Sequence, residues 1–428
     1  MFSPTREKMR GAMFAFTPNE DQKMMQDSVA QFARTTLRPR LRQFEAARGV
    51  ADDVRKTAHE MGLGLVALPS EIGGAGLGLL TAVLLEEEVA WGDPAAAFGF
   101  GGPGAFGFAV QELATDEQAS KLLAGFAAGD GHSRFGAVAW GEPAAAIDRP
   151  GLVTVAHADA DGFRLTGEKA YVTNADRADS FVVFAQVDPA LGWSGLGAFV
   201  VAKDNPGLAI QPRVTTLGLD AGSFGSIVLT GAKVSGPDRL LGKASARPTA
   251  FPTRGGDFDA ALVRFFAKNA LVMAARGVGL SRAAFEITRE YCDTRIAFGK
   301  PIGHFQAVAF TLADRAMEVD AARTLVWRAA WLWDSGAPEN DALLATAYAI
   351  SFTHEAAMRA GDDAVQLHGG AGFMRDYPVE KLMRDAKQLQ LCGMTAEQAD
   401  QLAAAIELGR PLDPGAILPS AETQSAFV

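Results

Sequence analysis

Cysteine and histidine are scarce in this chain, and their scarcity excludes two common kinds of site. The 428 residues include two cysteines, Cys292 and Cys392, too few for a disulfide framework or a cysteine-rich zinc site. We interpret both thiols as small core residues in a reducing, cytoplasmic setting. The six histidines show no metal-ligand spacing, so no metal site is expected.

An excess of positive charge is also missing. Lys and Arg number 40 against 50 Asp and Glu, which gives a net charge of −10. This balance argues against non-specific nucleic-acid binding and against a polybasic membrane anchor. The uncharged stretch 94–110 is shorter than the roughly 20 residues that a membrane-spanning helix needs, and prolines and glycines interrupt it. We therefore expect no membrane association, no secretion signal, and a buried, closely packed segment at 94–110.

Several nucleotide and hydrolase motifs are absent, namely the Walker A sequence, H-E-x-x-H and G-x-S-x-G. The letters G-x-G-x-x-G do occur from Gly99 to Gly104. No strand is expected before them, and Pro103 lies where a helix should begin, so we interpret these glycines as positions of close helix packing.

The residues that are present change in character twice along the chain. Asn19 is expected to cap an early helix, with Gln22 at the capping-box spacing, and a second helical stretch is expected to stop at Gly92. Short segments rich in β-branched and aromatic residues follow, and then long helical patterns return. The chain is therefore expected to have an α+β fold with an N-terminal α-helical domain (1–130), a middle antiparallel β-domain (131–250) and a C-terminal helical bundle (251–428).

Four segments carry chemistry-bearing residues: G-E-P through Asp148, T-G-E-K-A-Y-V-T ending at Thr173, R-x-x-F-G-K from Arg295, and a Gln/Gly turn followed by R-D-A-K from Arg384. Alone, each has an ordinary structural explanation, such as a surface ion pair for Arg295 or a helix C-cap for the Gly pair. Because the four segments occur together and in this order, the sequence resembles the acyl-CoA dehydrogenase family of flavoproteins, from about Pro18 to about Glu407. The resemblance implies a four-helix C-terminal bundle, FAD bound between subunits of a dimer or tetramer, an acyl thioester substrate, and an electron-transfer flavoprotein as electron acceptor.

The resemblance also implies which residues meet FAD. Tyr171 would offer an aromatic face to the flavin ring, and Thr173 would reach the N5/O4 edge with its hydroxyl. Arg295 would meet the pyrophosphate of a neighbour's FAD, because a planar guanidinium matches phosphate oxygens. The full set of expected cofactor-binding residues is Trp140, Gly141, Tyr171, Thr173, Arg295, Phe298, Gln306, Gln366, Gly369, Gly370 and Thr395.

The sequence departs from the family where the substrate would react. The family's reaction is α,β-dehydrogenation, in which a Glu removes the α-proton and the β-hydrogen leaves as hydride to flavin N5. The two positions that carry this Glu in the family are Gly393 and Asn269 here, and Ala270 replaces an adjacent arginine. Gly141 and Ile147 replace the Thr and Ser of the family's T-E-P-x-A-G-S-D motif.

Three hypotheses follow from these losses. The chain is an active dehydrogenase with a relocated base, for which Asp93 is the candidate, although Asp93 also has a simpler explanation as a cap before Pro94. Alternatively, it is a non-catalytic partner subunit that donates FAD-binding residues to a catalytic paralogue in a hetero-oligomer. A flavin oxidase or monooxygenase on the same fold is the third alternative. We take FAD-dependent dehydrogenation of a CoA or carrier-bound thioester as the expected function.

Overall fold

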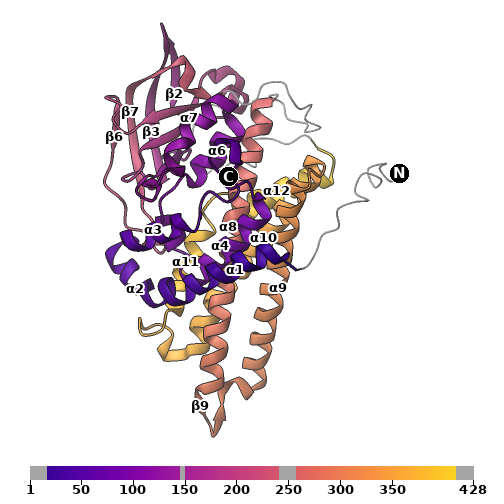
Figure 1. Cartoon of the computed structure of the whole chain (residues 1–428). Helices are drawn as coiled ribbons and strands as arrows, with labels where there is room; N and C mark the ends of the chain where they lie inside the picture. The colour runs from indigo at the N-terminus through magenta and orange to yellow at the C-terminus, as the bar shows by residue number, and fades with distance from the viewer. Residues whose placement is uncertain (1–16, 145–149, 241–256, 411–428) are drawn as a thin grey trace.

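The computed structural model describes residues 17–144, 150–240 and 257–410, in which helices precede and follow a sheet (Figure 1). The N-terminal helices are α1 (Glu20–Phe32), α2 (Arg38–Ala47), α3 (Asp52–Glu60), α4 (Gly78–Gly92), α5 (Ala96–Gly99), α6 (Gly104–Leu113) and α7 (Asp116–Ala127). The capping box of Asn19 and Gln22 at the start of α1 is confirmed, and so is the end of the second predicted helix at Gly92.

The glycine-rich segment 94–110 forms α5 and most of α6 and lies in the core, as predicted. A Cβ on Gly99 would lie only 2.6 Å from the carbonyl oxygen of Ala221, so the helix backbone touches the loop before β7. Within the described residues no helix is long and apolar enough to cross a membrane.

The middle region is an eight-stranded sheet with the order β6-β7-β3-β2-β4-β5-β8, and β1 pairs with β4 beside this path. Its strands are β1 (Gly136–Ala139), β2 (Val155–Asp159), β3 (Gly162–Thr173), β4 (Ser180–Gln186), β5 (Leu196–Ala202), β6 (Leu208–Ile210), β7 (Phe224–Ser235) and β8 (Arg239–Leu240). Most pairs are antiparallel, as predicted, but β1 and β2 each run parallel to β4. Neither is joined to β4 by a hairpin, because β3 lies between them in the chain, so no tight turn forces an antiparallel pairing.

The C-terminal region is a bundle of long helices, with α8 (Asp257–Thr294), α9 (Gln306–Asp334), α10 (Glu339–His368), α11 (Val379–Leu389) and α12 (Ala396–Glu407). A two-stranded hairpin of β9 (Ile296–Ala297) and β10 (Lys300–Pro301) joins α8 to α9. This hairpin lies at the end of the bundle farthest from the sheet (Figure 1).

Candidate functional site

The end of β3 exposes an aromatic ring beside a hydroxyl. The pairing of β3 with β7 is irregular between Lys169 and Val172, and Tyr171 takes φ 57° there, with 76% of its surface exposed. Thr173 is half-buried at the last pair of the two strands. A Cβ on Gly141 would lie 3.0 Å from the Ala170 carbonyl oxygen, so the segment after β1 passes close to this strand end.

A buried ion pair holds this arrangement together. The Glu142 carboxylate accepts hydrogen bonds from the amides of Val153 and Thr154, at 2.6 and 2.8 Å, and from Lys169 Nζ at 2.8 Å. Burial opposes ionisation of Glu142, but the charge and hydrogen bonds of Lys169 outweigh it and lower the pKa of the carboxyl. Burial lowers the pKa of Lys169 to about 8 against the pull of Glu142, so both groups are charged at pH 7.

Trp140 lies inside this region rather than on its surface. Its ring packs edge-on against Phe184 and Phe266, with centroids 5.0 and 4.8 Å apart, and its carbonyl oxygen accepts from Lys169 Nζ. The indole therefore belongs to the aromatic core, and any contact of Trp140 with a cofactor would come from its backbone.

A second group of predicted residues lies at the tip of the bundle. Phe298 in the β9–β10 hairpin has φ 52° and is 96% exposed, and Arg295 and Gln306 are exposed beside it. Within the part of the chain that the structure describes, the Arg295 side chain has no hydrogen-bond or ion-pair partner.

The Gln/Gly turn lies at the same end. Gly369 ends α10 at φ 55°, and Gln366, Gly369 and Gly370 are exposed. The ring of Tyr291, one turn before Arg295, stacks on His368 with centroids 4.1 Å apart, so the turn and the hairpin are held together.

Thr395 and Asp93 occupy structural positions. Thr395 is the N-cap of α12, where its hydroxyl accepts from the Gln398 amide at 3.3 Å. Asp93 is 1% exposed, and its Oδ1 accepts from the Ala95 amide and from Lys381 Nζ at 2.7 Å. Asp93 therefore has the surroundings of an ion-paired structural carboxylate rather than those of an open base.

Lys381 joins three regions of the chain. Its ammonium group contacts Asp93 at the end of α4 and Asp385 of its own helix at 2.6 Å. Asp385 also accepts from the backbone amide of Leu219 in the middle region at 2.6 Å. Burial, together with the charge of Asp93, raises the pKa of Asp385 against the pull of Lys381.

The two positions to which the resemblance assigns the family's Glu lie side by side. Gly393 has φ 82°, and a Cβ there would lie 3.3 Å from Ala270 Cα and 3.5 Å from Met273 Cγ. Asn269, which is half-buried, precedes Ala270 on α8. The absence of a carboxylate at both positions therefore affects one and the same place in the fold.

An ion pair between Arg276 and Glu86, which the sequence did not reveal, lies near these two positions. Arg276, 8% exposed, donates from Nε to Glu86 at 2.8 Å across the contact between α8 and α4. Its guanidinium lies over the Phe98 ring, 4.5 Å from the centroid, and Phe98 accepts a hydrogen bond from Asn174, the residue after Thr173. The helical spacing between Asn269 and Arg276 was the one signal that could have found it, since residues seven apart share a helix face.

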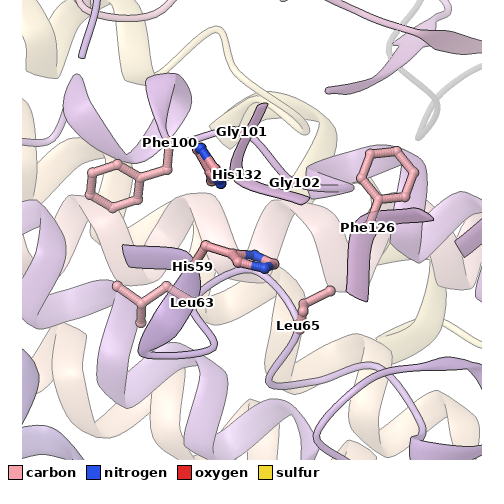
Figure 2. Close-up of a pocket in the computed structure, with 8 residues that line it drawn as sticks. All are labelled: His59, Leu63, Leu65, Phe100, Gly101, Gly102, Phe126 and His132. Atoms are coloured by element: carbon pink, nitrogen blue, oxygen red, sulfur yellow. The ribbon is translucent and has the colours of Figure 1, made fainter. Parts of the chain in front are cut away.

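A shallow pocket in the N-terminal region lies apart from these residues in the sequence. It is lined by His59, Leu63, Leu65, Phe100, Gly101, Gly102, Phe126 and His132. Figure 2 shows the two histidines on facing walls, and their ring centroids are 6.2 Å apart. Gly101 and Gly102 come from the G-x-G-x-x-G letters, and a helix, α5, precedes them rather than a strand.

The order of the three regions, with an exposed strand end on the sheet and an exposed hairpin on the bundle, defines a class of three-domain oxidoreductases. Family models for the N-terminal, middle and C-terminal domains of acyl-CoA dehydrogenase match residues 19–130, 137–232 and 258–406. The chain belongs to the acyl-CoA dehydrogenase family, whose members are FAD-dependent oxidoreductases.

Individual relatives match most of the chain. A probable acyl-CoA dehydrogenase, YngJ of Bacillus subtilis, is 32% identical over 386 residues, covering 89% of this chain and 96% of the relative. The solved butyryl-CoA dehydrogenase of Megasphaera elsdenii is 26% identical with a TM-score of 0.82, covering 92% of this chain and all of that one. A structure described as an electron transferring flavoprotein of Acidaminococcus fermentans is 29% identical with a TM-score of 0.81 and the same coverage.

Proposed function

We propose that this chain is an FAD-dependent oxidoreductase that removes hydrogen from the α- and β-carbons of a CoA or carrier-bound acyl thioester. The observation that carries the proposal is the open end of β3, where an exposed ring, a hydroxyl and a close backbone approach come together at Tyr171, Thr173 and Gly141. FAD, when bound, accepts the hydride from the β-carbon.

The exposed residues fit FAD chemically. Tyr171 offers a flat aromatic face, Thr173 a hydroxyl, and Arg295 an exposed guanidinium suited to a pyrophosphate. At Gly369 and Gly370 a Cβ would meet nothing within 4 Å, so the backbone there is open to an approaching group. Because the hairpin lies at the far end of the bundle from the sheet (Figure 1), one copy's hairpin would serve a neighbour's FAD in a dimer or tetramer. An electron-transfer flavoprotein is the proposed electron acceptor.

One observation favours a second function. Gly393 and Asn269 carry no carboxylate, so neither position to which the resemblance assigns the base can supply one. A partner subunit that lends Arg295 and the Gln/Gly turn to a catalytic paralogue needs no base of its own.

The test is the amount of flavin bound per polypeptide, measured from the visible absorbance of the chain purified alone, followed by anaerobic addition of butyryl-CoA. About one flavin per chain with bleaching by the thioester is the result expected for a dehydrogenase. Little flavin, restored by co-expression with a paralogue, would instead establish the partner subunit. Rapid reoxidation with product hydroxylation would overturn both in favour of a monooxygenase.

A further inference from the structure

Helices α4 and α8 come into direct contact just beyond the place where the family's base would lie. Along α8 from Ala270, the next residue beside Gly393 is Met273, and Arg276 follows with its Nη1 at 3.8 Å from the Met273 sulfur. The rise from Ala270 to Arg276 is about 9 Å along the helix axis. One turn further, a Cβ on Gly279 would lie 2.2 Å from the Glu87 carbonyl oxygen. The helix backbones touch there, so no chain of atoms can pass between them beyond Arg276.

Arg276 is held in this position on several sides. Glu86 binds its Nε from α4, and the Phe98 ring lies beneath its guanidinium plane. The positive charge of Arg276 also reaches Cys392, the neighbour of Gly393, and opposes the burial that raises the pKa of that thiol to about 12. Within the described residues, the hydrogen-bond acceptors of the two Nη groups are limited to one thioether sulfur, which is a weak acceptor. The guanidinium therefore has hydrogen-bond donors to spare.

We propose that Arg276, fixed by Glu86, closes the acyl end of the site and selects short acyl thioesters whose far end carries an oxygen acceptor. This inference rests on the proposed function. An acyl group whose α-carbon lies beside Gly393 would run along Met273 and Phe98 and end at the guanidinium. A long aliphatic tail would have to displace a buried, ion-paired arginine.

The test is isothermal titration of the FAD-loaded protein with butyryl-, succinyl- and octanoyl-CoA, with the visible spectrum of the flavin as a second readout. For the wild type we expect octanoyl-CoA to bind roughly tenfold more weakly than butyryl-CoA. Preferred binding of succinyl-CoA would identify a carboxylate as the acceptor, and equal binding of the two short thioesters would contradict the acceptor requirement. Arg276→Ala should bind octanoyl-CoA roughly tenfold more tightly than the wild type does, whereas Arg276→Met, which keeps the volume, should not.

Arg264→Ala is the matched control, because it removes another half-buried ion pair of α8, with Glu112 of α6. It should leave the order of the three thioesters unchanged. Octanoyl-CoA binding as tightly as butyryl-CoA to the wild type would overturn this inference and leave the proposed function standing. The absence of binding of any thioester to flavin-loaded protein, in wild type and variants alike, would overturn both.

Discussion

At the scale of single residues, Glu142 illustrates how a motif residue can act by positioning others. Its carboxylate ties the start of β2 to Lys169, and Lys169 in turn binds the carbonyl of Trp140. The exposed end of β3 therefore depends on a pair that is itself buried.

Glu142→Gln should destabilise the protein at pH 7 by about 3–5 kcal/mol, because the charge of Lys169 would be left buried without its partner. The pKa of Glu142 is lowered in the folded state from 4.5, so its contribution is present above that value and is lost as the pH falls through the folded pKa. Urea unfolding at pH 7 and at a series of pH values below 4.5 should show the difference between wild type and variant shrinking as the pH falls. A difference that stays constant would show that ionisation of Glu142 is not the cause.

Introducing a glutamate as a base should have different effects at Asn269 and at Gly393. Asn269→Glu should raise the rate of anaerobic flavin bleaching by butyryl-CoA by about 10²–10⁴-fold, because the helix accepts Glu without strain. Gly393→Glu should gain less, because φ 82° strains any other residue by roughly 1–3 kcal/mol and Ala270 crowds its Cβ. A wild type that already bleaches as fast as Asn269→Glu would show that the chain has another base.

At the scale of elements, the helix boundaries that local chemistry decides were predictable. Asn19 with Gln22 begins α1, and Gly92 ends α4, because a cap depends on residues within one turn. The R-x-x-F-G-K motif marked Arg295 and Phe298 as candidate site residues, and both are exposed in the structure. The parallel pairing of β1 with β4 and the approach of Gly393 to Ala270 were not predictable, because each joins segments far apart in the chain and no local pattern encodes the partner.

Substitutions at Thr395, the N-cap of α12, separate a structural role from a cofactor role. Thr395→Ala should lower the free energy of unfolding by about 1 kcal/mol through loss of the N-cap, and Thr395→Ser should restore it. Thermal melts and flavin content of both variants provide the measurement. A fall in flavin content without a change in thermal stability would assign Thr395 to FAD instead.

At the scale of the whole molecule, the buried Lys381 amine links the three regions. Its contact with Asp93, and the contact of Asp385 with Leu219, join different domains and were not predictable from the sequence, whereas Lys381 and Asp385 lie four residues apart on one helix.

Lys381→Met should destabilise the whole chain by about 3–5 kcal/mol, since the buried carboxylates of Asp93 and Asp385 would lose the ammonium group that both contact. Arg164→Met, which removes the exposed pair with Asp159, is the control and should cost far less, because solvent screens an exposed ion pair. Chemical unfolding followed by near-ultraviolet circular dichroism reports both. A cost for Lys381→Met no greater than the control would show that the junction is not a source of stability.

The same junction limits how far the chain can be divided. A fragment cut at either domain boundary would keep only part of the set: the N-terminal piece would hold Asp93 without Lys381, and the bundle would hold Lys381 with one carboxylate fewer. The three domains that family models recognise separately are therefore not interchangeable modules, and a domain taken from a relative must bring its own residue for this contact. Chimeric proteins built from domains of different family members should fold stably only where the domains supply matching residues for this contact.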